Sequence, residues 1–281
     1  MSTLLVTLRE GAEAALIVAI VLAYLRSSGR QEQARWVWGG VAGAVVAAGA
    51  AGTVLHLTVG SLEGRAEELV EGFVALAAVA LLTWMVFWMA ARAGSLRSRL
   101  ETEMAGAMGR GGGWALAALC FVAVLREGLE TALFLIAAGS GTGGAAQVMG
   151  GVGGLAAAAA VGLAVYHGGR RLDLRLFFWV TGVLILLFAA GLVARGVHAF
   201  EEAGLLPALL DPVWDLGFGY PASNPAGRAA AEAFGWTPAP SLLQVLAYWA
   251  YVLPVGWAFW VRARRRPAAQ AAEAPEGAAV G

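Results

Sequence analysis

Charged residues are scarce in this chain of 281 residues, and lysine is absent altogether. Charged side chains make up 14% of the residues, against about 25% in an average soluble domain, whereas 59% are hydrophobic. This composition argues against a water-soluble globule. The 19 basic residues, all arginine, balance 19 acidic ones, so the net charge gives no reason to expect a nucleic-acid partner.

Cysteine is nearly absent as well. Cys120 lies inside an apolar run, which excludes a disulfide framework and a thiolate metal cluster. The first residues also lack the basic region of a signal peptide, and Arg9, Glu10 and Glu13 interrupt the apolar run that follows. We therefore expect the first apolar segment to be retained as a helix.

Long apolar stretches are what the sequence does contain. Seven of them have about the length of a membrane-spanning helix and are bounded by charged residues or by Gly/Pro clusters. They cover about 2–25, 36–59, 67–91, 114–138, 146–166, 176–199 and 241–261. The sequence therefore predicts an all-α polytopic membrane protein with seven transmembrane helices in a lipid bilayer.

The arginines fix a predicted orientation. Fourteen of the 19 follow the first, third, fifth or seventh span. They are Arg26, Arg30, Arg35, Arg92, Arg97, Arg99, Arg110, Arg170, Arg171, Arg175, Arg262, Arg264, Arg265 and Arg266. By the positive-inside rule, the N-terminus lies outside the cytoplasmic membrane and the C-terminus inside. We predict one transmembrane domain over 1–262, an outer loop at about 200–240, and a basic, then disordered tail over 263–281.

Two charged pentapeptides lie inside the predicted spans. Residues 9–13 and 126–130 both have the pattern Arg-Glu-Gly-x-Glu, about 117 residues apart. Ionisable groups at this depth cost several kcal/mol, so they usually face the interior of a helical bundle and serve a function. Because three spans, an odd number, precede the unit that holds the second copy, we predict two inverted three-helix repeats, over about 2–91 and 114–199, plus a seventh helix.

Helical spacing brings the charges of each pentapeptide onto one face. The two glutamates are three residues apart, and the arginine is four residues before the second glutamate. Glu10, Glu13, Glu127 and Glu130 would then meet between the repeats, as a set of oxygen ligands suited to hard cations such as ferric iron, manganese, magnesium or calcium. The alternative is that Arg9 and Arg126 form ion pairs that only hold helices together.

Two further polar groups lie at the predicted outer surface. Glu67, Glu68 and Glu71 open the third span, where a cation would meet them first, although the helix dipole also favours acidic residues there. His198 lies about one turn from Glu201 and Glu202 at the outer end of the sixth span and is either a ligand or an interfacial residue.

The sequence resembles the oxidase-dependent iron permeases, the family of fungal high-affinity iron permeases and bacterial EfeU-type transporters. The resemblance rests on the two pentapeptides, the acidic cluster that opens the third span, the seven spans and the stretch from Val197 to Gly204. It covers nearly the whole chain except the tail. The first pentapeptide has Ala12 where leucine is common in the family.

The resemblance implies import of iron, commonly handled as ferric iron after oxidation by a separate extracytoplasmic ferroxidase. By position, Glu10, Glu13, Glu127 and Glu130 would bind the translocated iron, and Arg9 and Arg126 would orient them. Glu67, Glu68 and Glu71 would receive iron at the outer face. No organic cofactor is implied, and iron is the substrate.

Other functions stay open at this point. A transporter of Mn²⁺ would use the same ligands, and a sensor would bind the ion without passing it. A membrane di-iron oxidase would typically need Glu-x-x-His, but Thr53, Ala164 and Arg195 stand three residues before the histidines, so we expect no enzyme. Gly39–Gly43 and Gly150–Gly154 have a spacing that serves packing within a subunit or in an oligomer.

Overall fold

Nearly continuous apolar sequence forms seven long α-helices in the part of the chain that the computed structural model describes, residues 2–92, 106, 112–137, 144–167, 174–215 and 239–272. They are α1 (Ser2–Ser27), α2 (Ala34–Val59), α3 (Arg65–Arg92), α5 (Gly112–Ala137), α6 (Gly144–Tyr166), α7 (Leu174–Glu202) and α9 (Leu242–Ala272). A short 3-10 helix, η1 (Gln31–Gln33), links α1 to α2. The described residues contain no β-strand, which confirms the predicted all-α class.

Five of these helices are long and apolar enough to cross a membrane by length and composition: α2, α3, α6, α7 and α9. The remaining two, α1 and α5, are as long but carry the two charged pentapeptides. Large apolar side chains also lie on the surface, among them Met149, Trp114 and Val46, each more than 70% exposed. Such a surface fits contact with lipid rather than with water.

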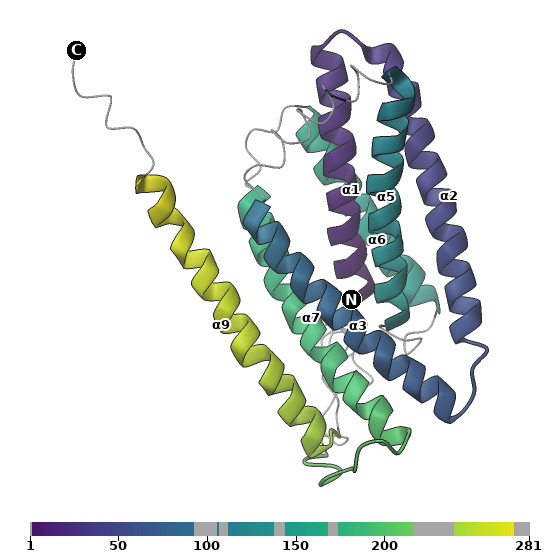
Figure 1. Cartoon of the computed structure of the whole chain (residues 1–281), viewed down its shortest axis with the longest axis vertical. Coiled ribbons are helices and arrows are strands. Elements are labelled where there is room, and N and C mark those ends of the chain that lie inside the picture. The colour runs from purple at the N-terminus through teal and green to yellow at the C-terminus, as the bar shows by residue number, and fades with distance from the viewer. Residues whose placement is uncertain are drawn as a thin grey trace.

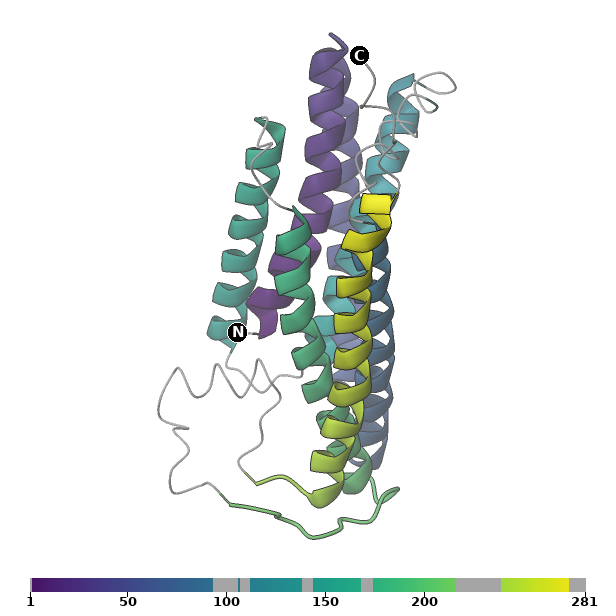
Figure 2. The same cartoon turned by 90° about the vertical axis from the view of Figure 1, so that its left-hand side faces the viewer.

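Helix packing places α1 and α5 at the centre of the bundle. Contacts join α1 to α6, α2 to α5 and α3 to α7, and α1 also touches α5. The helix α9 packs on α7, at the edge of the bundle (Figure 1), and the helices follow a common long axis (Figure 2). The glutamates of both pentapeptides are therefore covered by other helices.

Glycine allows this close packing at the middle residue of each pentapeptide. A Cβ atom on Gly11 would lie 2.9 Å from Cβ of Ala158 in α6, and one on Gly128 would lie 2.6 Å from Cβ of Ala48 in α2. Gly154, from one of the two small-residue pairs noted in the sequence, packs against α1 within the same chain. Two of the helix contacts that enclose the charged residues thus depend on glycine.

The last helix continues past the predicted seventh span. The predicted span, about 241–261, agrees with the candidate membrane span Leu242–Arg262, but α9 continues to Ala272, so residues 263–272 of the predicted disordered tail are helical. Alanine, arginine and glutamine in this extension favour a helix, although Pro267 does not. Parts of the sequence prediction lie outside the described residues. They are residues 216–238 of the predicted outer loop, residues 273–281 of the tail, and Arg97, Arg99, Arg110, Arg170 and Arg171.

Candidate metal site

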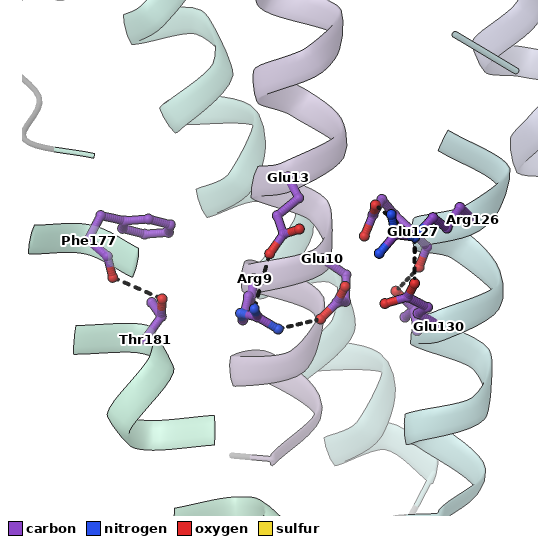
Figure 3. A network of polar contacts seen from close by, with 9 residues as sticks. Arg9, Glu10, Glu13, Arg126, Glu127, Glu130, Phe177 and Thr181 are labelled. Atoms are coloured by element: carbon purple, nitrogen blue, oxygen red, sulfur yellow. Dashed lines mark hydrogen bonds and ion pairs between the residues drawn. The ribbon is translucent and has the colours of Figure 1, made fainter. Parts of the chain in front are cut away.

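Three of the four predicted ligands lie together between α1 and α5. Glu10, Glu127 and Glu130 each offer one carboxylate oxygen, and these three oxygens lie within 4.8 Å of one another. Figure 3 shows Glu10 on α1 directed toward the α5 side chains. Two segments far apart in the sequence thus build one carboxylate cluster.

Two arginines hold these carboxylates from opposite sides of the cluster. Arg9 Nη1 lies 3.3 Å from Glu10 Oε1, and Arg9 Nη2 lies 3.3 Å from Glu13 Oε1. On α5, Arg126 Nε donates a hydrogen bond of 2.8 Å to Glu130 Oε1. The predicted pairing of arginine with the glutamate four residues later is therefore present in both pentapeptides. Glu13, the fourth predicted ligand, lies outside the group of three and contacts Arg9 instead.

The carboxylates are buried and only partly satisfied. Glu10, Glu13, Glu127 and Glu130 are at most 8% exposed. Glu10 Oε2, Glu127 Oε2 and Glu130 Oε2 have no hydrogen-bond partner in the structure. A buried carboxylate oxygen without a partner is costly, and a bound cation would remove that cost. The packing alternative, in which the arginines alone satisfy the glutamates, leaves these three oxygens unexplained.

The two arginines differ in their surroundings. Arg9 is 1% exposed, whereas the side chain of Arg126 is 40% exposed. The guanidinium of Arg126 lies over the ring of Trp88 on α3, at 5.6 Å from the ring centroid. The two pentapeptides are thus alike in sequence but not in environment, because α3 places an aromatic ring against only one of the guanidinium groups described here.

A large cavity reaches the carboxylate cluster from one end of the bundle. Its volume is about 1310 Å³, and its lining includes Glu10 and Glu127. It extends past Thr131 to Glu67 and Glu71 at the start of α3. Further lining residues at that end are His56 and Gly60 of α2, His198 of α7 and Gln244 of α9. The cavity therefore connects the predicted outer acidic residues with the cluster.

The bundle is tightly packed on the other side of the cluster. Leu16 of α1, Met89 of α3 and Phe178 of α7 form a buried apolar group there, each less than 8% exposed. Leu16 follows Glu13 by less than one turn of α1. The cavity is thus open toward the predicted outer end of the helices, and this apolar group lies on the side of the predicted cytoplasmic end.

At the open end, α3 and α7 approach each other closely. A Cβ atom on Gly72 would lie 2.5 Å from the Phe200 ring, which packs edge-on against Phe73 with ring centroids 5.2 Å apart. This contact brings Glu68 close enough to Glu202 of α7 for their charges to interact. Two of the residues predicted to receive the cation therefore meet across the two helices.

His198 and Glu201, two further residues of the predicted outer groups, contact the start of α9. Both oxygens of Glu201 accept hydrogen bonds from Ser241 Oγ, at 2.7 and 2.9 Å. Gln244 Nε2 lies 3.0 Å from Glu201 Oε2 and 3.0 Å from His198 Nδ1. Glu201 is therefore engaged in joining α7 to α9. Gln244 was not among the predicted site residues; a glutamine inside an apolar span was the available signal.

Comparison with known proteins is consistent with this geometry. The description "Iron permease FTR1 family" belongs to a family model that matches residues 1–264. The chain is 40% identical over 252 residues to the "Ferrous iron permease EfeU" of Yersinia pestis, covering 89% of each chain. It is 39% identical over 260 residues to the protein of the same name from Escherichia coli O6:K15:H31, covering 91% of this chain and 93% of that one. No solved structure matches the chain significantly.

Proposed function

This chain belongs to the iron permease FTR1 family, and from that premise we propose that iron crosses the membrane by way of the carboxylates of the two pentapeptides. The observation that carries the proposal is the buried group formed by Glu10, Glu127 and Glu130, whose oxygens lie within 4.8 Å of one another beside a cavity. Carboxylate oxygens are suitable ligands for iron and for other hard cations.

The proposed path begins at the open end of the cavity. Glu67 and Glu71 line this end and attract cations by their charge. The ion then moves toward Glu10 and Glu127, where carboxylate oxygens replace part of its water shell. Arg9 keeps Glu10 in place by an ion pair that the cation does not have to break, because Glu10 Oε2 is free of hydrogen bonds.

The predicted inverted repeats give this path a mechanism. In the predicted repeats, α1 of the first unit corresponds to α5 of the second, and α2 corresponds to α6. A contact between α1 and α6 therefore has its counterpart in a contact between α5 and α2. Both contacts are present, and both have a pentapeptide glycine at the point of close approach. We propose that the repeats rock against each other around the carboxylate cluster, which exposes it to the two sides in turn.

The charge of the cluster bears on the oxidation state of the ion. Four glutamates and two arginines leave two negative charges when all are ionised, which a divalent cation would neutralise. The relatives are named ferrous iron permeases. The ferric iron and the extracytoplasmic ferroxidase that the sequence suggested stay predictions, as do the seven spans, the outside N-terminus and the location in the cytoplasmic membrane.

Radioactive iron uptake into proteoliposomes that contain the purified protein tests the proposal. Wild type is compared with Glu127→Gln, and Glu32→Gln serves as a matched control because Glu32 is exposed on η1, away from the cluster. Iron is supplied as Fe²⁺ under reducing conditions or as Fe³⁺ citrate, with Mn²⁺ as competitor.

We expect wild type and Glu32→Gln to accumulate iron and Glu127→Gln to lose most of the uptake, roughly tenfold or more, since even indirect partners of a metal ligand are worth that much. Preference for Mn²⁺ would identify the alternative cation. Equal uptake by Glu127→Gln would contradict the carboxylate path, and binding without any uptake would indicate a sensor.

A further inference from the structure

Gln244 lies at a point where α7, α9 and the cavity meet. Its side chain is buried, with the residue only 5% exposed, and it is among the residues that line the cavity. It belongs to α9, the helix outside the two predicted repeats, and α9 contacts α7 along the edge of the bundle (Figure 1). The role of this buried amide follows from the groups that it contacts.

The directions of the hydrogen bonds around Gln244 follow from chemistry. A carboxylate can only accept, so the atom 3.0 Å from Glu201 Oε2 is the amide nitrogen. The same nitrogen lies 3.0 Å from Nδ1 of His198, and its second proton points there. Because an amide NH₂ group can only donate, Nδ1 must accept with its lone pair.

This arrangement determines which ring nitrogen of neutral His198 carries the proton. With Nδ1 accepting, the proton is on Nε2. Nε2 lies 3.5 Å from Oε1 of Glu202, where a proton is attracted and a lone pair would be repelled. Both neighbours therefore favour the same tautomer, and no imidazole lone pair of His198 is left for a cation at the open end of the cavity.

We propose that Gln244 is a positioning residue for ion selectivity, which keeps His198 from acting as a nitrogen ligand. The cation-receiving residues then present only oxygen, from Glu67, Glu68, Glu71 and Glu202. This matters because Cu²⁺ and Zn²⁺ generally bind nitrogen ligands more tightly than Fe²⁺ does. A role in ion selectivity presupposes the proposed iron transport. The tautomer and its effect on zinc binding do not depend on transport.

The tautomer is measured by NMR on purified protein labelled with ¹⁵N-histidine, with His198→Asn used to assign the signal among the three histidines. We expect wild-type His198 to carry its proton on Nε2. In Gln244→Glu the new carboxylate accepts where the amide donated, so Nδ1 should gain a proton while Glu202 still favours the proton on Nε2. A proton on Nδ1 in wild type, or no change in the variant, would overturn the proposal.

Zinc binding gives the second readout. Gln244→Leu removes the amide without adding a ligand, and Tyr251→Phe is the matched control, because it breaks a different polar contact of α9, the 2.6 Å hydrogen bond with Thr83 of α3. We expect the zinc affinity of the purified protein to rise at least tenfold in Gln244→Leu and to stay unchanged in Tyr251→Phe.

The gain should disappear in the double variant Gln244→Leu/His198→Asn, since the freed imidazole causes it. An unchanged zinc affinity in Gln244→Leu, with a normal elution profile of the protein, would overturn the proposal, and so would a gain that survives the loss of His198. If iron uptake fails while these results hold, the proposed transport function is wrong and the role of Gln244 stands.

Discussion

One carboxylate oxygen of Glu10 and one of Glu127 lie within 4.8 Å of each other, although the two residues are 117 positions apart in the chain. Two buried carboxylates this close repel each other when both are ionised, and a proton on one of them removes this repulsion. A cation that binds both oxygens has to displace such a proton, because metal ligands bind in their deprotonated form. Ion binding and proton release are therefore expected to be linked at this site.

We predict that iron binding releases about one proton per ion. Calorimetric titration of the purified protein in buffers of different ionisation enthalpy measures this number. In Glu10→Gln the repulsion between the two carboxylates is absent, so any residual binding should release fewer protons. Binding without proton release in wild type would show that the two carboxylates are already ionised before the cation arrives.

The burial of the two arginines predicts unequal effects of their loss. Arg9→Met leaves Glu10 and Glu13 buried without a partner and should destabilise the protein by about 3–5 kcal/mol. Arg126→Met should cost less, because the Arg126 side chain is partly exposed. Thermal unfolding in detergent compares the two, and a second change, Glu13→Gln, should recover part of the stability lost in Arg9→Met. A larger effect of Arg126→Met would contradict the role given to burial.

The glycines of the pentapeptides should tolerate no side chain. Gly128→Ala would place a methyl group 2.6 Å from Cβ of Ala48, so α2 and α5 would have to separate, at a cost of about 1–3 kcal/mol. Gly39→Ala on α2 is the control, because its Cβ meets nothing within 4 Å and alanine favours the helix. The melting temperature should fall in the first variant and stay level or rise in the second.

The predicted orientation places the two ends of α2 on opposite sides of the membrane. Cysteine at position 61, in Ser61→Cys, should react with a membrane-impermeant maleimide added to intact cells, and cysteine at position 28, in Ser28→Cys, should react only after lysis. Both serines are exposed, and the native Cys120 is fully buried, which keeps the background low. The reverse pattern of labelling would invert the assigned topology.

Much of this architecture could be predicted from the sequence because charge inside an apolar span is so costly. The pentapeptides indicated both the buried face of α1 and α5 and the meeting of Glu10 with Glu127. Helix bounds followed from the apolar stretches to within a few residues, except at the end of α9, which continues past the apolar stretch to Ala272.

The finer contacts depend on tertiary packing and left no pattern in the sequence. Spacing alone predicted Glu13 and Glu10 equally as metal ligands. In the structure Glu13 contacts Arg9 and lies outside the group of three oxygens. Glu201 and Glu202 are neighbours in the chain, yet one joins α7 to α9 and the other meets Glu68. The rotation of α7 against α3 and α9 decides this, and no local pattern encodes it.

The most direct test of the central claim is equilibrium binding of iron to the detergent-purified protein, in wild type, Glu10→Gln and Glu127→Gln, with Glu32→Gln as control. The cluster built from both pentapeptides predicts that wild type and Glu32→Gln bind iron with the same affinity and that each of the other variants loses this binding. Iron binding that survives in both Glu10→Gln and Glu127→Gln would contradict the account and place the ion elsewhere in the cavity.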